Sequence, residues 1–143
     1  MPLLLIVDFT ALAFSLMVST ALLIIVGGSG IRKPLNLTFA LFALLQAGWA
    51  GASVLLRLSL WFRLGEAIPL LYIATACFAF MAPFLLLFVA RFTSLRSSWP
   101  LWTALAVGVV SLAHLVPLLR GSLVFDPSID SNGVTLYELR TWG

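Results

Sequence analysis

Four long apolar segments restrict the fold of this chain more than any other feature. They extend over Ile6–Val26, Leu37–Leu58, Ala67–Phe88 and Pro100–Leu119. Each approaches the roughly 20 residues that a helix needs to cross about 30 Å of hydrocarbon. Of the 143 residues, 62% are hydrophobic and only 9% are charged, which is too little charge to cover the surface of a soluble domain. The sequence therefore predicts an integral membrane protein with lipid as its solvent.

Short connections separate these segments, so consecutive helices are expected to run antiparallel. The predicted fold class is all-α, with four transmembrane helices in an antiparallel bundle. Residues 1–120 form the predicted transmembrane region. Residues 121–143 are more polar and form a short extracytoplasmic loop or tail, in which Asn132-Gly133 stands between short apolar runs. Such a dipeptide is typical of a two-residue β-hairpin turn.

The positive-inside rule gives no clear orientation for these spans, because basic residues are divided equally between the two sides. Arg57 can extend its charged group toward the interface from near a helix end. Arg140 is far from any predicted span, so neither Arg57 nor Arg140 contributes much to the choice of orientation. We expect the N-terminus to lie outside. The basic residues on the predicted inner side are Arg32, Lys33, Arg91 and Arg96, and those on the outer side are Arg57, Arg63, Arg120 and Arg140.

Sequence motifs for catalysis or metal binding are missing from this chain. It has no Gly-rich phosphate loop, HExxH pair, nucleophile elbow or CxxC motif. Cys77 is the only cysteine, so neither an intrachain disulfide nor a thiolate cluster can form. The net charge of +3 is small and scattered, which excludes a nucleic-acid-binding stripe. We therefore assign no catalytic residue and no metal site, and whether the chain belongs to an enzyme stays open.

Polar residues inside the spans are the first candidates for function, because they are costly in lipid. Gln46, Ser53 and Arg57 follow one another at intervals of seven and four residues, with Trp49 between them, and so share a stripe of the second helix. Arg57 lies near the helix end, where a charge costs little. Gln46 lies near the centre, where either an interhelical hydrogen bond of roughly 0.6 kcal/mol or a ligand or ion contact would explain it.

Small residues at intervals of four indicate surfaces for helix packing. Ala43, Ala47 and Gly51 form such a ridge on the second span, and Ala104 and Gly108 repeat the pattern on the fourth. The partner helices are expected to come from the same full-length chain, from a homodimer or from a larger complex.

Two prolines lie inside the predicted helices. Pro83 and Pro117 lack the amide hydrogen of a normal helix residue and leave the carbonyl groups of Ala79 and Ala113 without their usual donors. Kinks are expected at both positions.

His114 is the only histidine and lies near the outer end of the fourth span, with Ser111 one turn earlier on the same face. A lone imidazole in a span can bind the metal of a tetrapyrrole, or it can sense pH or a ligand. It can also be a neutral residue that is hydrogen-bonded to a neighbour. These alternatives stay open, and no cofactor is otherwise expected.

Two stretches, PLNLTFALFALLQAGWAGASVLL and MAPFLLLFVARFTSLRSSWPLWTALAVGVVSLAHLVPLL, combine a late tryptophan in the second span with a mid-helix proline and a polar exit in the third. This order of features resembles the seven-helix N-terminal sensor region of bacterial histidine kinases and some diguanylate cyclases. The resemblance covers the first four helices. It implies a sensory input region in the bacterial inner membrane, truncated before its remaining helices and its catalytic domain.

A second hypothesis is a complete accessory or structural subunit of a larger photosynthetic or respiratory membrane complex. In that case the small-residue ridges would dock against other subunits, and His114 could contact a pigment. A transporter is less well supported, because the paired broken helices typical of inverted repeats are missing.

Overall fold

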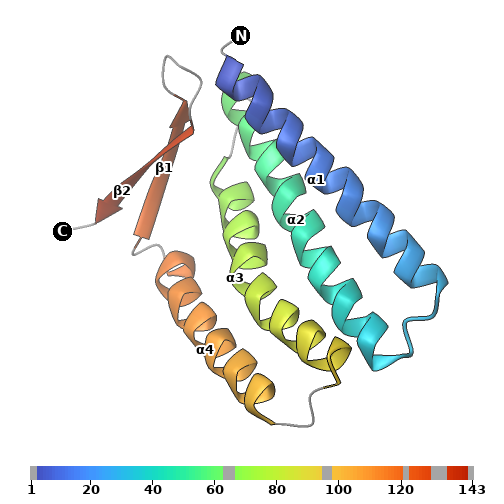
Figure 1. The fold of residues 1–143 in the computed structure, drawn as a ribbon. Coiled ribbons are helices and arrows are strands. Elements are labelled where there is room, and N and C mark those ends of the chain that lie inside the picture. The colour runs from blue at the N-terminus through green and yellow to red at the C-terminus, as the bar shows by residue number, and fades with distance from the viewer. Residues whose placement is uncertain (1–2, 63–66, 95–97, 121–122, 130–134, 142–143) are drawn as a thin grey trace.

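The computed structural model describes residues 3–62, 67–94, 98–120, 123–129 and 135–141. Within these ranges, four helices are followed by two strands (Figure 1). The elements are α1 (Leu3–Gly28), α2 (Pro34–Phe62), α3 (Ala67–Phe92), α4 (Trp99–Leu119), β1 (Leu123–Ile129) and β2 (Thr135–Thr141).

All four helices are long and apolar enough to cross a membrane, which confirms the four predicted spans. α2 differs most from its predicted range because it begins at Pro34 and ends at Phe62. Proline is well suited to the first turn of a helix, where no amide donor is required. The 29 residues of α2 give a length of roughly 43 Å at ~1.5 Å per residue, so this helix is longer than the hydrocarbon layer.

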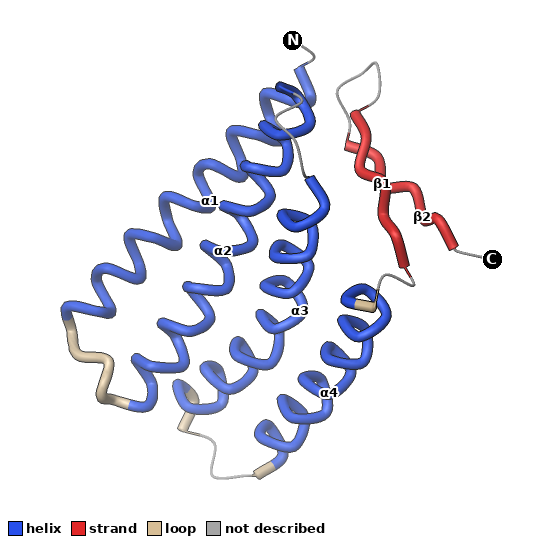
Figure 2. Tube along the Cα trace, turned by 180° about the vertical axis from the view of Figure 1, so that it is seen from behind, coloured by secondary structure: helices blue, strands red, loops and turns tan. Residues whose placement is uncertain are grey.

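The helices form an open row in which each packs mainly on its neighbour in sequence (Figures 1 and 2). The chain direction alternates along the row, α2 and α3 lie in the middle, and α1 and α4 form the two edges. The row is open, because the edge helices α1 and α4 do not pack together. In lipid, an apolar face gains little by leaving its solvent, so no hydrophobic force closes the row.

Small residues allow α2 to approach both of its neighbours. Ala43 and Ala50 are almost completely buried. A Cβ atom placed on Gly48 would lie only 2.8 Å from the sulfur of Cys77 in α3. On another side of α2, a Cβ atom on Gly51 would make an ordinary contact of 3.7 Å with Leu16 of α1. The predicted small-residue ridge therefore serves packing within this chain, and Gly48 makes the closer approach.

The two strands pair in an antiparallel sheet with Leu123 opposite Thr141 and Ile129 opposite Thr135. β1 contacts α2, α3 and α4. The hairpin lies at the end of the row where the N-terminus is found (Figure 1). The predicted Asn132-Gly133 turn falls outside the described residues.

The opposite end of the row is tied by hydrogen bonds between connections and helices. Gly30 has a φ of 97°, a backbone conformation that glycine tolerates, and its carbonyl accepts a 2.9 Å bond from the side-chain amide of Asn36. Arg91, in the last turn of α3, donates a 2.8 Å bond from Nη1 to the carbonyl oxygen of Pro34. The end of α3 is thus fixed to the beginning of α2.

Candidate functional site

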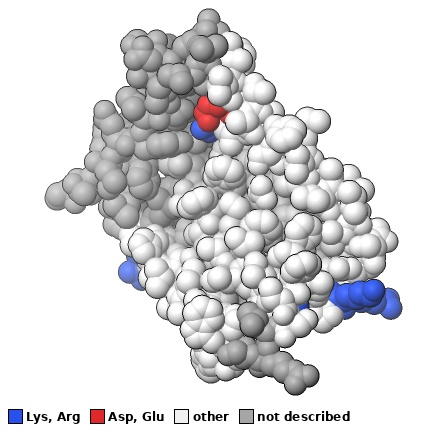
Figure 3. Space-filling view, viewed as in Figure 1, with Lys and Arg blue, Asp and Glu red and all other residues white. Residues whose placement is uncertain are grey.

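An ion pair joins α1 to α2 near the end of the row where α1 begins. Arg57 donates from Nε to the Asp8 carboxylate, and from Nη1 to the carbonyl oxygen of Ser53 at 3.1 Å. The side chain of Arg57 is 15% exposed and that of Asp8 is 46% exposed. An acidic and a basic group lie together near one end of a broad surface that is otherwise mostly uncharged (Figure 3). Arg57 is therefore held by Asp8 as well as by its own helix.

The sequence contained a signal for this pair that the stripe on α2 did not reveal. In an antiparallel helix hairpin, residues at similar distances from the connection lie at similar depth. Asp8 precedes the end of α1 by 20 residues (28 − 8), and Arg57 follows the start of α2 by 23 residues (57 − 34). Asp8 is also the only acidic residue in the four predicted spans, so it was the natural partner for Arg57.

The predicted polar stripe of α2 divides between two neighbouring helices. Gln46 and Arg57 reach toward α1, where the Gln46 side-chain amide lies 3.4 Å from the hydroxyl oxygen of Ser15. This contact is the interhelical hydrogen bond considered from the sequence, at the long end of the usual range. Trp49 and Ser53 instead border a cavity between α2 and α3.

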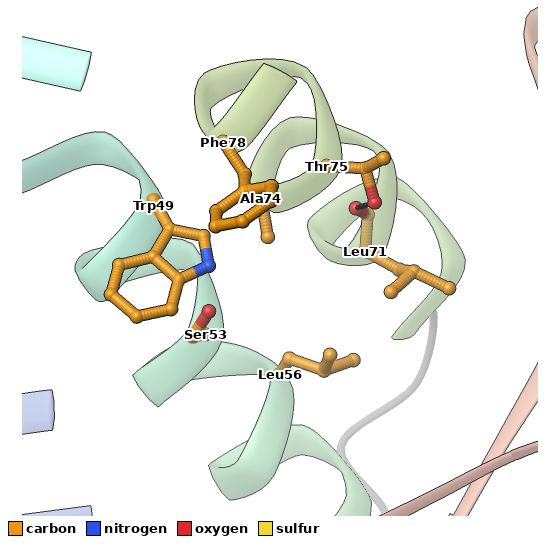
Figure 4. Close-up of a pocket in the computed structure, with 7 residues that line it drawn as sticks. All are labelled: Trp49, Ser53, Leu56, Leu71, Ala74, Thr75 and Phe78. Atoms are coloured by element: carbon orange, nitrogen blue, oxygen red, sulfur yellow. Dashed lines mark hydrogen bonds between the residues drawn. The ribbon is translucent and has the colours of Figure 1, made fainter. Parts of the chain in front are cut away.

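This cavity has a volume of about 380 Å³ (Figure 4). Ser53 is only 6% exposed, and its hydroxyl faces the cavity in the close-up view, as does the indole nitrogen of Trp49. The rings of Trp49 and Phe78 are tilted against each other, with centroids 6.2 Å apart. The lining residues are Trp49, Ser53 and Leu56 from α2 and Leu71, Ala74, Thr75 and Phe78 from α3.

The hydroxyl of Ser53 differs from other hydroxyls in the helices, most of which donate a hydrogen bond to a backbone carbonyl of their own helix. Within the described part of the chain, neither this hydroxyl nor the indole N–H of Trp49 has a hydrogen-bond partner. The residues whose hydroxyls donate to the carbonyl oxygen four residues earlier are Thr10, Ser19, Thr38, Thr75, Thr93 and Thr103. Two unused donors therefore face one mostly apolar cavity.

A second, larger hollow of about 750 Å³ continues along the same face between α3 and α4. Thr75 and Phe78 border both cavities, so the two adjoin. Ser111 and His114, both predicted from the sequence, line this second hollow together with Phe42 of α2.

Ser111 replaces the helix hydrogen bond that is missing because of Pro83. Its hydroxyl donates a 2.8 Å bond to the carbonyl oxygen of Ala79, the group that the proline leaves without its helical donor. Pro83 is buried, and a Cβ atom on Gly108 would lie 4.0 Å from the proline ring. Ala104, one turn before Gly108, is 3% exposed. The predicted α4 ridge therefore packs against the proline of α3.

Both prolines lie inside helices that continue past them. Pro117 lies in the last turn of α4, so only two helical residues follow it.

The exposed ring of His114 lies 2.8 Å from the carbonyl oxygen of Val110 through Nδ1. A carbonyl oxygen can only accept, so Nδ1 donates in this contact, and in the neutral ring Nε2 keeps its lone pair. That nitrogen could provide one axial ligand to a tetrapyrrole metal. Within the described ranges, no group of three or more His, Cys, Asp or Glu residues is placed to hold a metal ion.

Comparisons with known proteins give no family assignment. No family model matches the chain, and no curated protein or solved structure is significantly similar to it. The function must therefore be inferred from the row of helices and its hollowed face.

Proposed function

We propose that this chain is the membrane-embedded sensory input region of a bacterial signal-transduction protein of the histidine-kinase type. The observation that carries the proposal is the face shared by α2, α3 and α4, which is hollowed by two adjoining cavities. Cavities of about 300–1,000 Å³ with a few convergent polar groups are typical of small-molecule sites. Trp49, Ser53 and His114 supply such groups at positions inside the helices.

The open row is a second source of support. A seven-helix region needs its first four helices to leave a face available for three more, and a row with free edges at α1 and α4 provides one. In this proposal the region lies in the bacterial inner membrane, with both termini outside. The hairpin of β1 and β2 then lies on the extracytoplasmic side.

The same open row also favours one alternative, the accessory subunit of a larger membrane complex. A free face of α2, α3 and α4 can dock against helices of another protein as well as against helices of the same chain. The two proposals differ in the mass and the activity of the native protein.

The test begins with the protein isolated from its native membrane. The sensor proposal predicts a species much heavier than 15.5 kDa that transfers the γ-phosphate of ATP to one of its own histidines. A native species of 15.5 kDa that copurifies with other membrane subunits would favour the accessory subunit and overturn the sensor proposal.

A pair of tryptophan variants in the full-length protein then tests whether this face is the input. Trp49→Ala removes one wall of the cavity and is expected to change the rate of autophosphorylation several-fold. Trp102→Ala, on an exposed position of α4, is the matched control and should leave the rate unchanged. Equal rates for the two variants and the unmodified protein would place the input elsewhere.

A further inference from the structure

The α2–α3 cavity combines features that select a particular kind of ligand. Among the described residues, no charged side chain lines it, and the guanidinium of Arg57 is occupied by Asp8 and by the carbonyl of Ser53. Within the part of the chain that the structure describes, the Ser53 hydroxyl and the Trp49 indole N–H are both unused donors. The Thr75 hydroxyl already donates its hydrogen to the carbonyl of Leu71 at 2.8 Å. The cavity is thus mostly apolar and holds two available donors.

We infer that this cavity binds an uncharged, membrane-soluble molecule through a carbonyl group, which accepts hydrogen bonds from Trp49 and Ser53. The inference deepens the proposed sensory function by giving the ligand a chemical class, and it rests on that function only for its biological meaning.

The positions of the two donors support a single shared acceptor. Trp49 and Ser53 are four residues apart and therefore lie on the same side of α2. A carbonyl oxygen has two lone pairs and can accept from both groups. The tilted rings of Trp49 and Phe78 form an apolar boundary beside this point, which suits an apolar ring next to the carbonyl (Figure 4).

Two probes of nearly the same shape test this chemistry. Duroquinone and durene share a ring with four methyl groups, but only duroquinone has carbonyl oxygens. The protein is labelled with ¹⁵N in its tryptophan indoles, purified in dodecyl maltoside, which has no carbonyl group, and titrated with each probe. The Trp49 signal is assigned as the one that Trp49→Phe removes.

Duroquinone is expected to move the Trp49 indole signal downfield in a saturable way. Durene, which cannot accept a hydrogen bond through a carbonyl group, is expected to cause no such downfield shift of the Trp49 signal. Ser53→Ala should weaken duroquinone binding about 3- to 10-fold, the effect of one neutral hydrogen bond. Ser19→Ala is the matched control, since Ser19 is also a buried serine but bonds within α1. It should bind duroquinone as tightly as the unmodified chain.

Three results would overturn the inference. The first is an equal response to the two probes, or no response to either. The second is unchanged duroquinone binding in Ser53→Ala while the other indole signals keep their positions, which shows that the variant is folded. The third is a Trp49 shift caused by added diacyl phospholipid but not by duroquinone, because this would assign the cavity to the ester groups of membrane lipid. Failure here leaves the phosphorylation test of the sensor proposal unaffected.

Discussion

The α1–α2 and α3–α4 contacts lie at the two edges of the same row, yet polar groups serve them in different ways. Between α1 and α2, side chains bond to side chains, with Arg57 on Asp8 and Gln46 on Ser15. Between α3 and α4, the Ser111 side chain bonds to a backbone carbonyl that a proline has released. The first contact compensates for charge in an apolar region, and the second compensates for a missing helix bond.

This difference determines what is lost when a partner is removed. Removing the Asp8 carboxylate leaves a guanidinium without its counterion, which is costly in a medium of low polarity. Removing the Ser111 hydroxyl leaves only a neutral carbonyl unpaired. We therefore expect the α1–α2 contact to be the more sensitive of the two to a single substitution.

The largest effect is expected for Asp8→Ala. It should lower the free energy of unfolding by about 1.5–3 kcal/mol, the range for hydrogen bonds to charged groups, measured by SDS titration in mixed micelles. Thr10→Ala is the matched control, because the exposed Thr10 bonds only within α1. Adding Arg57→Met to Asp8→Ala should restore part of the loss. Equal costs for the Asp8 and Thr10 variants would show that the ion pair does not stabilise the row.

A smaller effect is expected for Ser111→Ala, which should cost about 0.6–1.7 kcal/mol, the range for interhelical hydrogen bonds in membranes. The cost should fall toward zero in a Pro83→Ala background, because the restored amide of residue 83 then bonds the Ala79 carbonyl. A double-mutant cycle measures this coupling. If the two substitutions are simply additive, Ser111 does not compensate for the proline.

The smallest effect is expected for Gln46→Leu. The bond from Gln46 to Ser15 is 3.4 Å long and is therefore worth less than about 0.6 kcal/mol. The same SDS titration should show little change in the free energy of unfolding. A loss as large as that of Asp8→Ala would mean that Gln46, rather than the ion pair, holds α1 to α2.

The spans could be predicted from sequence because hydropathy is a local property of each segment. The same is true of the Ala79 carbonyl, since a proline affects a known position in its own helix. The ion pair was missed because it requires the relative depth of two helices. The cavity was missed because Ser53 and Gln46 share a stripe but face different neighbours, and only the rotation of α2 in the row separates them. The open row itself could not be predicted, because in lipid no hydrophobic force favours or opposes closing four helices into a bundle.

The close approach of Gly48 to Cys77 has a consequence for how the row can move. The Cys77 side chain lies in the space that a side chain at position 48 would need, which hinders sliding of α3 past α2, and Arg91 also joins the end of α3 to the start of α2. We therefore expect the two central helices to move together. A rearrangement in response to a bound molecule would then be carried by α1 moving about its contact with α2, or by α4 moving about its contact with α3.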